Sequence, residues 1–190
     1  MKALSSRAKH SRDALIRSGL ELLINNKEAS LKDISAHANV GRATLYRHFE
    51  TKEDLMIAIG FCCLERLGDA CKHIESESDS AVEAINLLFH SIIPLADELR
   101  FLECLEMLAN QEPKLMNIYM KQMQDTWNLV ERAKAEGDIS NELPTTWITN
   151  LIEGLTYAAS ETLAYGQNTP EEVAKFAYRT FSNGVICSKR

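Results

Sequence analysis

The sequence predicts an all-α protein of about nine helices, and three observations support this fold class. Apolar residues recur three and four positions apart along most of the chain, which is the period of an amphipathic helix. Ser or Thr stands three residues before an acid at Ser30, Thr51 and Ser80, a spacing typical of helix starts. No alternating pattern of apolar and polar residues is long enough to predict a strand.

The N-terminal part predicts two short helices joined by a tight turn. Ser30 and Asp33 have the spacing of a capping box and open the first short helix. Asn39 ends it, because Asn tolerates the left-handed backbone conformation nearly as well as Gly. Gly41 then lets the chain enter the second short helix, from about Arg42 to His48. This is the helix-turn-helix layout, in which the second short helix enters the major groove of DNA.

Two longer predicted helices, over about residues 7–26 and 51–74, flank this pair. The second should complete a three-helix head with Leu55 and Ile59 and reach into the rest of the chain with its later residues. We therefore expect a helix-turn-helix domain over residues 1–52, completed by the linking helix to about residue 60. An effector-binding and dimerisation domain follows over residues 53–190. The stripe on the first helix that should pack against the two short helices consists of Leu15, Gly19, Leu22 and Leu23.

The side chains left on the outer side of the second short helix suit DNA. Leu45 and Phe49, four positions apart, belong to the buried stripe, so the others face outward. Arg binds guanine with two parallel hydrogen bonds, Thr, Tyr and His suit phosphate oxygens, and Ala can contact a thymine methyl group. An ordinary solvated helix also carries Arg and His, but the caps, the turn and the clustered donors together favour DNA. With two nearby lysines, the predicted DNA-binding residues are Lys32, Arg42, Ala43, Thr44, Tyr46, Arg47, His48 and Lys52.

The distribution of charge agrees with this interpretation. The net charge is −6, yet residues 1–52 hold ten Lys and Arg against five Asp and Glu, a balance of +5 that leaves −11 elsewhere. A basic head on an acidic body is typical of a two-part DNA-binding protein. Whether the basic residues Arg7, Lys9 and Arg12 also reach DNA is left open by the motif.

The run NVGRATLYRHFETKEDL, preceded by DISAHA, resembles the N-terminal domain of TetR-family bacterial transcriptional regulators. The resemblance covers about residues 10–60 and departs from the family pattern at Ser35 and Asn39, where Ala and Gly are usual. It implies a small, mostly apolar effector. The leading hypothesis is a repressor that binds a near-palindromic operator and releases it when the effector binds, with an activator as the alternative. The matching residues are Ile34, Val40, Thr44, Leu45, Tyr46, His48, Phe49, Lys52, Glu53 and Leu55.

The remaining predicted helices span about residues 80–96, 99–109, 112–136, 144–165 and 170–187. Pro94 should disturb the end of the first, and Gly137 and Gly166 should end the third and fourth. On the last two helices, apolar residues cover more of the helix surface than one core-facing stripe requires, and small residues stand among them. This pattern favours a twofold interface between chains. An intramolecular core explains part of the pattern equally well. The resemblance implies a homodimer formed by these two helices, and the predicted interface residues are Trp147, Leu151, Leu155, Ala158, Val173, Phe176, Ala177, Thr180 and Phe181.

Candidate effector-binding residues combine adaptable methionines, aromatic rings that can stack on a flat ligand, and a carboxylate that can pair with a cation. An ordinary core or surface position is the alternative for each of them. The histidines show no ligand-like spacing, so neither a metal ion nor another cofactor is predicted. The candidates are Phe61, Glu103, Met107, Met120, Met123, Trp127 and Tyr157.

Composition and motifs bear on other function classes. The chain of 190 residues is 45% apolar and 25% charged, as in soluble globular proteins, and no apolar run approaches the ~20 residues of a spanning helix. We therefore expect a cytoplasmic location with no membrane segment. An all-α enzyme would need a catalytic motif, and the closest approach is the weak pair Glu103 and Glu106. Five cysteines without CxxC spacing predict inert thiols, with a redox-responsive regulator as the alternative.

Overall fold

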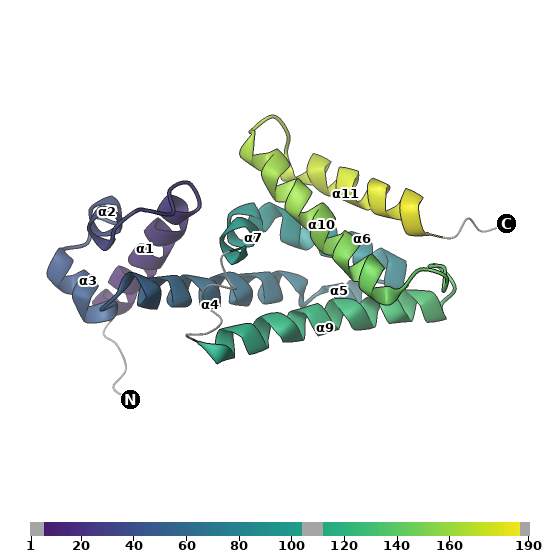
Figure 1. The fold of residues 1–190 in the computed structure, drawn as a ribbon, viewed down its shortest axis with the longest axis horizontal. Helices are drawn as coiled ribbons and strands as arrows, with labels where there is room; N and C mark the ends of the chain where they lie inside the picture. Colours follow the sequence, from purple (N-terminus) through teal and green to yellow (C-terminus); the bar gives the residue numbers. More distant parts are fainter. Residues whose placement is uncertain (1–5, 104–111, 187–190) are drawn as a thin grey trace. The chain divides into compact units, whose positions relative to one another are not determined.

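The computed structural model describes residues 6–103 and 112–186. These residues are helical apart from turns, loops and an isolated antiparallel β-bridge between Ile139 and Ile186, so the all-α prediction is confirmed (Figure 1). The helices in chain order are α1 (Ser6–Leu23), α2 (Leu31–His37), α3 (Arg42–His48), α4 (Lys52–Cys71), α5 (Ile74–Glu77), α6 (Ala81–Ile92), the 3₁₀ helix η1 (Ile93–Leu95), α7 (Ala96–Leu102), α9 (Pro113–Ala135), α10 (Thr145–Ala164) and α11 (Pro170–Val185).

The chain divides into two compact units. The first comprises Met1–Leu64 with Phe101–Met116, and the second comprises Glu65–Arg100 with Asn117–Arg190. Helix α4 is continuous across the division after Leu64, so it supplies residues to both units. The domain boundary placed after residue 52 stays a prediction.

The first unit is built around one apolar cluster. Helices α1, α2 and α3 pack together, and the first half of α4 adds Leu55 and Ile59, both with no exposed surface. Gly19 faces α4 rather than the two short helices, which corrects the expectation from its position in the stripe. A Cβ added there would lie 2.8 Å from Ile59 Cδ1, so the missing side chain lets α1 and α4 approach closely. The cluster consists of Leu15, Ile16, Leu23, Ala29, Ile34, Leu45, Phe49, Leu55, Ala58, Ile59, Cys63 and Phe101.

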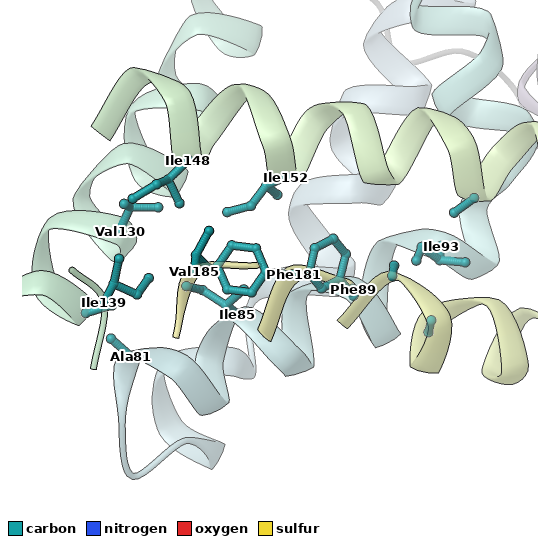
Figure 2. Close-up of a cluster of buried hydrophobic side chains, with 14 of the residues drawn as sticks. Ala81, Ile85, Phe89, Ile93, Val130, Ile139, Ile148, Ile152, Phe181 and Val185 are labelled. Carbon is teal, nitrogen blue, oxygen red and sulfur yellow. The ribbon is translucent and has the colours of Figure 1, made fainter. Parts of the chain in front are cut away.

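The second unit has its own core between α6, α10 and α11. The rings of Phe89 and Phe181 meet edge to face with their centroids 6.0 Å apart. Ile148 and Ile152 point from α10 toward these rings (Figure 2). An edge-to-face pair in a fully buried position contributes about 0.5–1.5 kcal/mol beyond the area it buries.

Several predicted helix ends are confirmed by their capping contacts. Asp54 N–H donates to Thr51 Oγ1 over 3.0 Å, and Thr51 N–H donates to Asp54 Oδ2 over 2.9 Å. Thr169 and Glu172 form the same reciprocal pair at the start of α11. Gly137 and Gly166 have φ of 79° and 70°, the left-handed conformation in which Gly commonly ends a helix.

The region between α4 and α7 differs from the expectation. The linking helix ends at Cys71 rather than near residue 74, and the separate short helix α5 follows. Pro94 does interrupt the next helix: α6 ends at Ile92 and Pro94 lies inside η1. Helix α7 then begins at Ala96, three residues before the predicted start, and the end of the predicted helix, residues 104–109, lies outside the described residues.

Among residues 6–103 and 112–186, none of the helices combines the length and the apolar character that crossing a bilayer requires. Over the same two stretches, no group of three or more His, Cys, Asp or Glu side chains is placed to hold a metal ion.

Candidate nucleic-acid interface

Local contacts of the backbone define the start of α2. Asp33 N–H donates to Ser30 Oγ over 3.3 Å, and the Asp33 carboxylate accepts from Ser30 N–H over 2.9 Å. These two bonds satisfy two backbone donors that the start of a helix leaves unpaired. The hydrogen bonds from Ser30 lower the pKa of Asp33 below its ordinary value, so the capping carboxylate stays ionised near neutral pH.

The turn between α2 and α3 explains both departures from the TetR pattern. Asn39 has a φ of 51°, so it occupies the left-handed conformation in which the family usually has Gly. The buried Ser35 hydroxyl donates to the Val40 carbonyl over 2.7 Å, and Val40 N–H donates back to the Ser35 carbonyl over 3.0 Å. Gly41 has an ordinary φ of −61°, so its conformational freedom is not needed for the chain to enter α3. Ser35 therefore holds the turn through a hydrogen bond that Ala would lack.

Helix α3 presents the predicted face. Leu45 and Phe49 are 1% and 3% exposed, which fixes the rotation of this seven-residue helix against the core. Arg47 Nη2 donates to Thr44 Oγ1 over 3.0 Å along the outer side. Of the predicted DNA-binding residues, Arg42, Ala43, Tyr46 and Arg47 on α3 and Lys32 on α2 are exposed, while Thr44, His48 and Lys52 are half-buried.

Helix α1 brings a further positive charge to the end of α3. The Arg12 guanidinium carbon lies 5.5 Å from the centre of the Phe49 ring, a cation–π contact. Partial burial lowers the pKa of His48, and the charges of Arg12 and Arg47 lower it further. Arg12 and Arg47 therefore place two positive charges near His48 and favour its neutral form. The motif left the role of Arg12 open, because its place beside Phe49 depends on packing between distant segments.

Lys52 has a structural contact that the sequence did not predict. Its ammonium group donates over 2.5 Å to the Lys27 carbonyl, 25 residues earlier in the chain. This bond ties the start of α4 to the segment between α1 and α2.

The candidate effector-binding residues are dispersed. Met120 and Tyr157 are more than half exposed, so neither is enclosed by its own unit. Met123 and Trp127 are half-buried on α9, and Phe61 is half-buried on α4. Phe61 and Glu103 belong to the first unit, whereas Met120, Met123, Trp127 and Tyr157 belong to the second; Met107 lies outside the described residues.

The predicted interface residues fall into two groups. Val173, Ala177 and Phe181 are 2%, 5% and 0% exposed, so they belong to the core of the second unit. The stripe of α11 packs on α6 and α10 of the same chain, and a part for these three residues in an interface stays a prediction. Trp147, Ala158, Phe176 and Thr180 are exposed on α10 and α11, and Leu151 and Leu155 are half-buried.

Two of the three cysteines that the structure describes, Cys63 and Cys71, do not favour redox chemistry. Burial raises the pKa of the Cys71 thiol to about 11, and Cys63 is buried. Since the thiolate is the reactive form, a raised pKa makes a thiol inert at neutral pH. The redox alternative therefore has no support from these residues; Cys104 and Cys187 lie outside the described part of the chain.

Comparisons with known proteins agree with the geometry. Residues 26–59 match the family model of bacterial regulatory proteins of the tetR family. No curated protein is significantly similar in sequence.

Solved structures share the fold over nearly the whole chain. The TetR-like transcriptional regulator LfrR from Mycobacterium smegmatis, in complex with proflavine, is 21% identical with a TM-score of 0.78, over 96% of this chain and all of that one. The ketosteroid transcriptional regulator KstR2 of Mycobacterium tuberculosis is 16% identical with a TM-score of 0.79, over 98% of both chains. The TetR family protein CprB from S. coelicolor A3(2) is 21% identical with a TM-score of 0.78, over 97% of this chain and 92% of that one. At these identities the likeness establishes the fold.

Proposed function

We propose that the chain is a TetR-family transcriptional regulator and, more closely, a dimeric repressor that a small molecule releases from its operator; its N-terminal signature and its fold support this. The proposal rests on one observation above all. Helix α3 is held by two buried side chains and carries Arg42, Tyr46 and Arg47 on its exposed side. Such a helix can enter the major groove, where Arg reads guanine with two hydrogen bonds.

A homodimer would present two copies of α3 to one face of a duplex. Two heads that read successive major grooves must lie about 34–36 Å apart, and a near-palindromic operator matches this twofold symmetry. On α10, Trp147, Leu151, Gly154 and Ala158 follow one another at intervals of four, three and four residues, which places them on one helix face. No atom lies within 4 Å of a Cβ added at Gly154 or at Gly184 of α11, so a helix of a second chain has room to approach there.

The effector would act on the second unit. LfrR was solved with proflavine, a flat aromatic molecule, and this supports a small organic effector for the present chain. Met123 and Trp127 on α9 are the predicted ligand residues of the second unit that remain half-buried. Because α4 supplies residues to both units, a ligand that favours one conformation of the second unit can change how the heads fit the operator. Only the difference in ligand affinity between the two conformations contributes to this effect.

The proposed function is tested by selecting bound duplexes from a random DNA pool and then screening small molecules for release of the selected sequence. We expect a near-palindromic consensus with two half-sites about one helical turn apart. Recovery of random sequences without a consensus would refute a sequence-specific regulator, and a set of releasing compounds would identify the effector class.

Substitutions separate the two kinds of DNA contact. Arg42→Ala or Arg47→Ala should cost about 1–3 kcal/mol and relax one base position if that residue reads a base edge. Uniform weakening over all sequences would instead make that Arg a phosphate contact.

A further inference from the structure

The Arg47 side chain runs back along α3 toward the start of the helix. Arg47 lies in the last turn of α3, yet its Nη2 donates over 3.0 Å to Thr44 Oγ1, three residues earlier. Helical side chains commonly lean toward the N-terminus in this way. The contact matters here because residues near the start of a recognition helix are the ones that reach base edges. The hydrogen bond therefore brings a guanidinium from the last turn to the part of the helix that reads sequence.

Thr44 is itself held in place. Leu45, the next residue, has 1% of its surface exposed, and Thr44 itself is half-buried. Thr is β-branched, so its Oγ1 has few accessible positions on a helix. The hydroxyl accepts from Arg47 and keeps its own proton for donation elsewhere. A fixed acceptor thus anchors the end of a long and flexible side chain.

The hydrogen bond leaves the guanidinium able to recognise a base. Arg has five N–H donors, so one bond to Thr44 leaves up to four for guanine O6 and N7. An Arg that is free in solution loses rotamer freedom when it binds a base, and a side chain already held in place loses less.

We propose that Thr44 is a positioning residue that determines which base pair Arg47 reads. The inference rests on the proposed function, since it requires an operator. It assigns Thr44 a part in sequence specificity, beyond that of a donor to phosphate. A phosphate contact would add affinity equally for all sequences, whereas a positioning role acts at one base pair.

The test uses the full-length protein and the operator selected by the wild type, with each half-site base pair varied in turn. Thr44→Val keeps the shape of the side chain but removes the acceptor, and Thr44→Ser keeps the acceptor. We expect Thr44→Val to lower the preference at one base pair about fivefold, the effect of one net hydrogen bond. Arg47→Ala should lower it at the same base pair, and Thr44→Ser should retain it.

A double-mutant cycle completes the test. Because both residues are proposed to act through one guanidinium, Thr44→Val added to Arg47→Ala should cause no further loss of preference at that base pair. The proposal would be overturned if Thr44→Val weakened binding to all operator variants equally. It would also be overturned if Thr44→Val left every base preference unchanged. If Thr44→Val fails to fold, Thr44→Ala, with its higher helix propensity, gives the same comparison. Failure of the wild type to select any consensus would instead refute the proposed function.

Discussion

At the scale of residues, Lys52 joins two distant segments of the first unit. Its ammonium group donates over 2.5 Å to the Lys27 carbonyl, while its position at the start of α4 also suits a DNA phosphate. We expect Lys52→Ala to lower the free energy of unfolding by about 1 kcal/mol, because one hydrogen bond from a charged donor is lost. The exposed Lys32 is the matched control, and Lys32→Ala should leave stability unchanged. Chemical denaturation of both variants measures this, and a Lys52→Ala protein as stable as the wild type would contradict a stabilising role for this hydrogen bond.

His48 predicts a pH dependence of stability. Partial burial first, and then the charges of Arg12 and Arg47, lower the pKa of His48 below its ordinary value of 6.5. The unfolded chain therefore takes up a proton at His48 at a higher pH than the folded chain does. The stability that the neutral imidazole contributes is complete above pH 6.5, and it is lost as the pH falls toward the lowered pKa of the folded state.

Denaturation at pH 8 and at pH 5 checks this expectation for His48. The free energy of unfolding should fall less on acidification in His48→Gln than in the wild type. Arg12→Ala removes one of the two repelling charges and should reduce the pH dependence in part. An identical pH dependence in His48→Gln and the wild type would show that other groups cause the acid loss.

At the scale of elements, the turn between α2 and α3 fixes the placement of α3. Ser35→Ala would remove the buried hydroxyl that donates to the Val40 carbonyl over 2.7 Å. We expect a loss of about 1–3 kcal/mol in the free energy of unfolding, because a part-buried carbonyl loses its partner.

Asn39→Gly should be neutral or stabilising, since Gly adopts the φ of 51° without strain. Asn39→Val should destabilise by about 1–2 kcal/mol, and a stable Asn39→Val variant would contradict the role assigned to this conformation.

Helix ends were predictable from the sequence where residues that are close in the chain determine them. At the starts of α2, α4 and α11, each capping side chain bonds a backbone N–H group three residues away in the chain. After α9 and α10, a glycine adopts the left-handed conformation that ends the helix. Between Cys71 and Ala96, Ser80 and Pro94 marked the start and the end of α6, but no comparable residue marked the break between α4 and α5 or the start of α7. The exposed side of α3 was predictable because the burial of Leu45 and Phe49 fixes the rotation of this helix. The contacts of Arg12 with Phe49 and of Lys52 with Lys27 depend on tertiary packing, so no local pattern predicts them.

At the scale of the whole molecule, an apolar stripe does not reveal whether the surface that covers it belongs to the same chain. Phe181 and Phe176 lie on the same helix and are both aromatic, yet one is fully buried and the other is 53% exposed. Phe181 packs on Phe89 within the second unit. Trp147 on α10 is also exposed, with 61% of its surface accessible. The exposed pair, rather than the buried stripe, is therefore the surface on which the proposed dimer depends.

Phe176→Glu tests that surface. A charge placed where an aromatic side chain would be desolvated should weaken dimerisation by about 2 kcal/mol or more, as at other aromatic interface positions. Operator affinity should fall with it, because a single head holds only one half-site, while the thermal unfolding of the monomer should change little. Ile118→Glu on α9, at a position 40% exposed, is the matched control for the added charge and should leave assembly intact. Sedimentation and operator titration of both variants measure these effects, and a Phe176→Glu protein that remains dimeric would exclude this face as the interface.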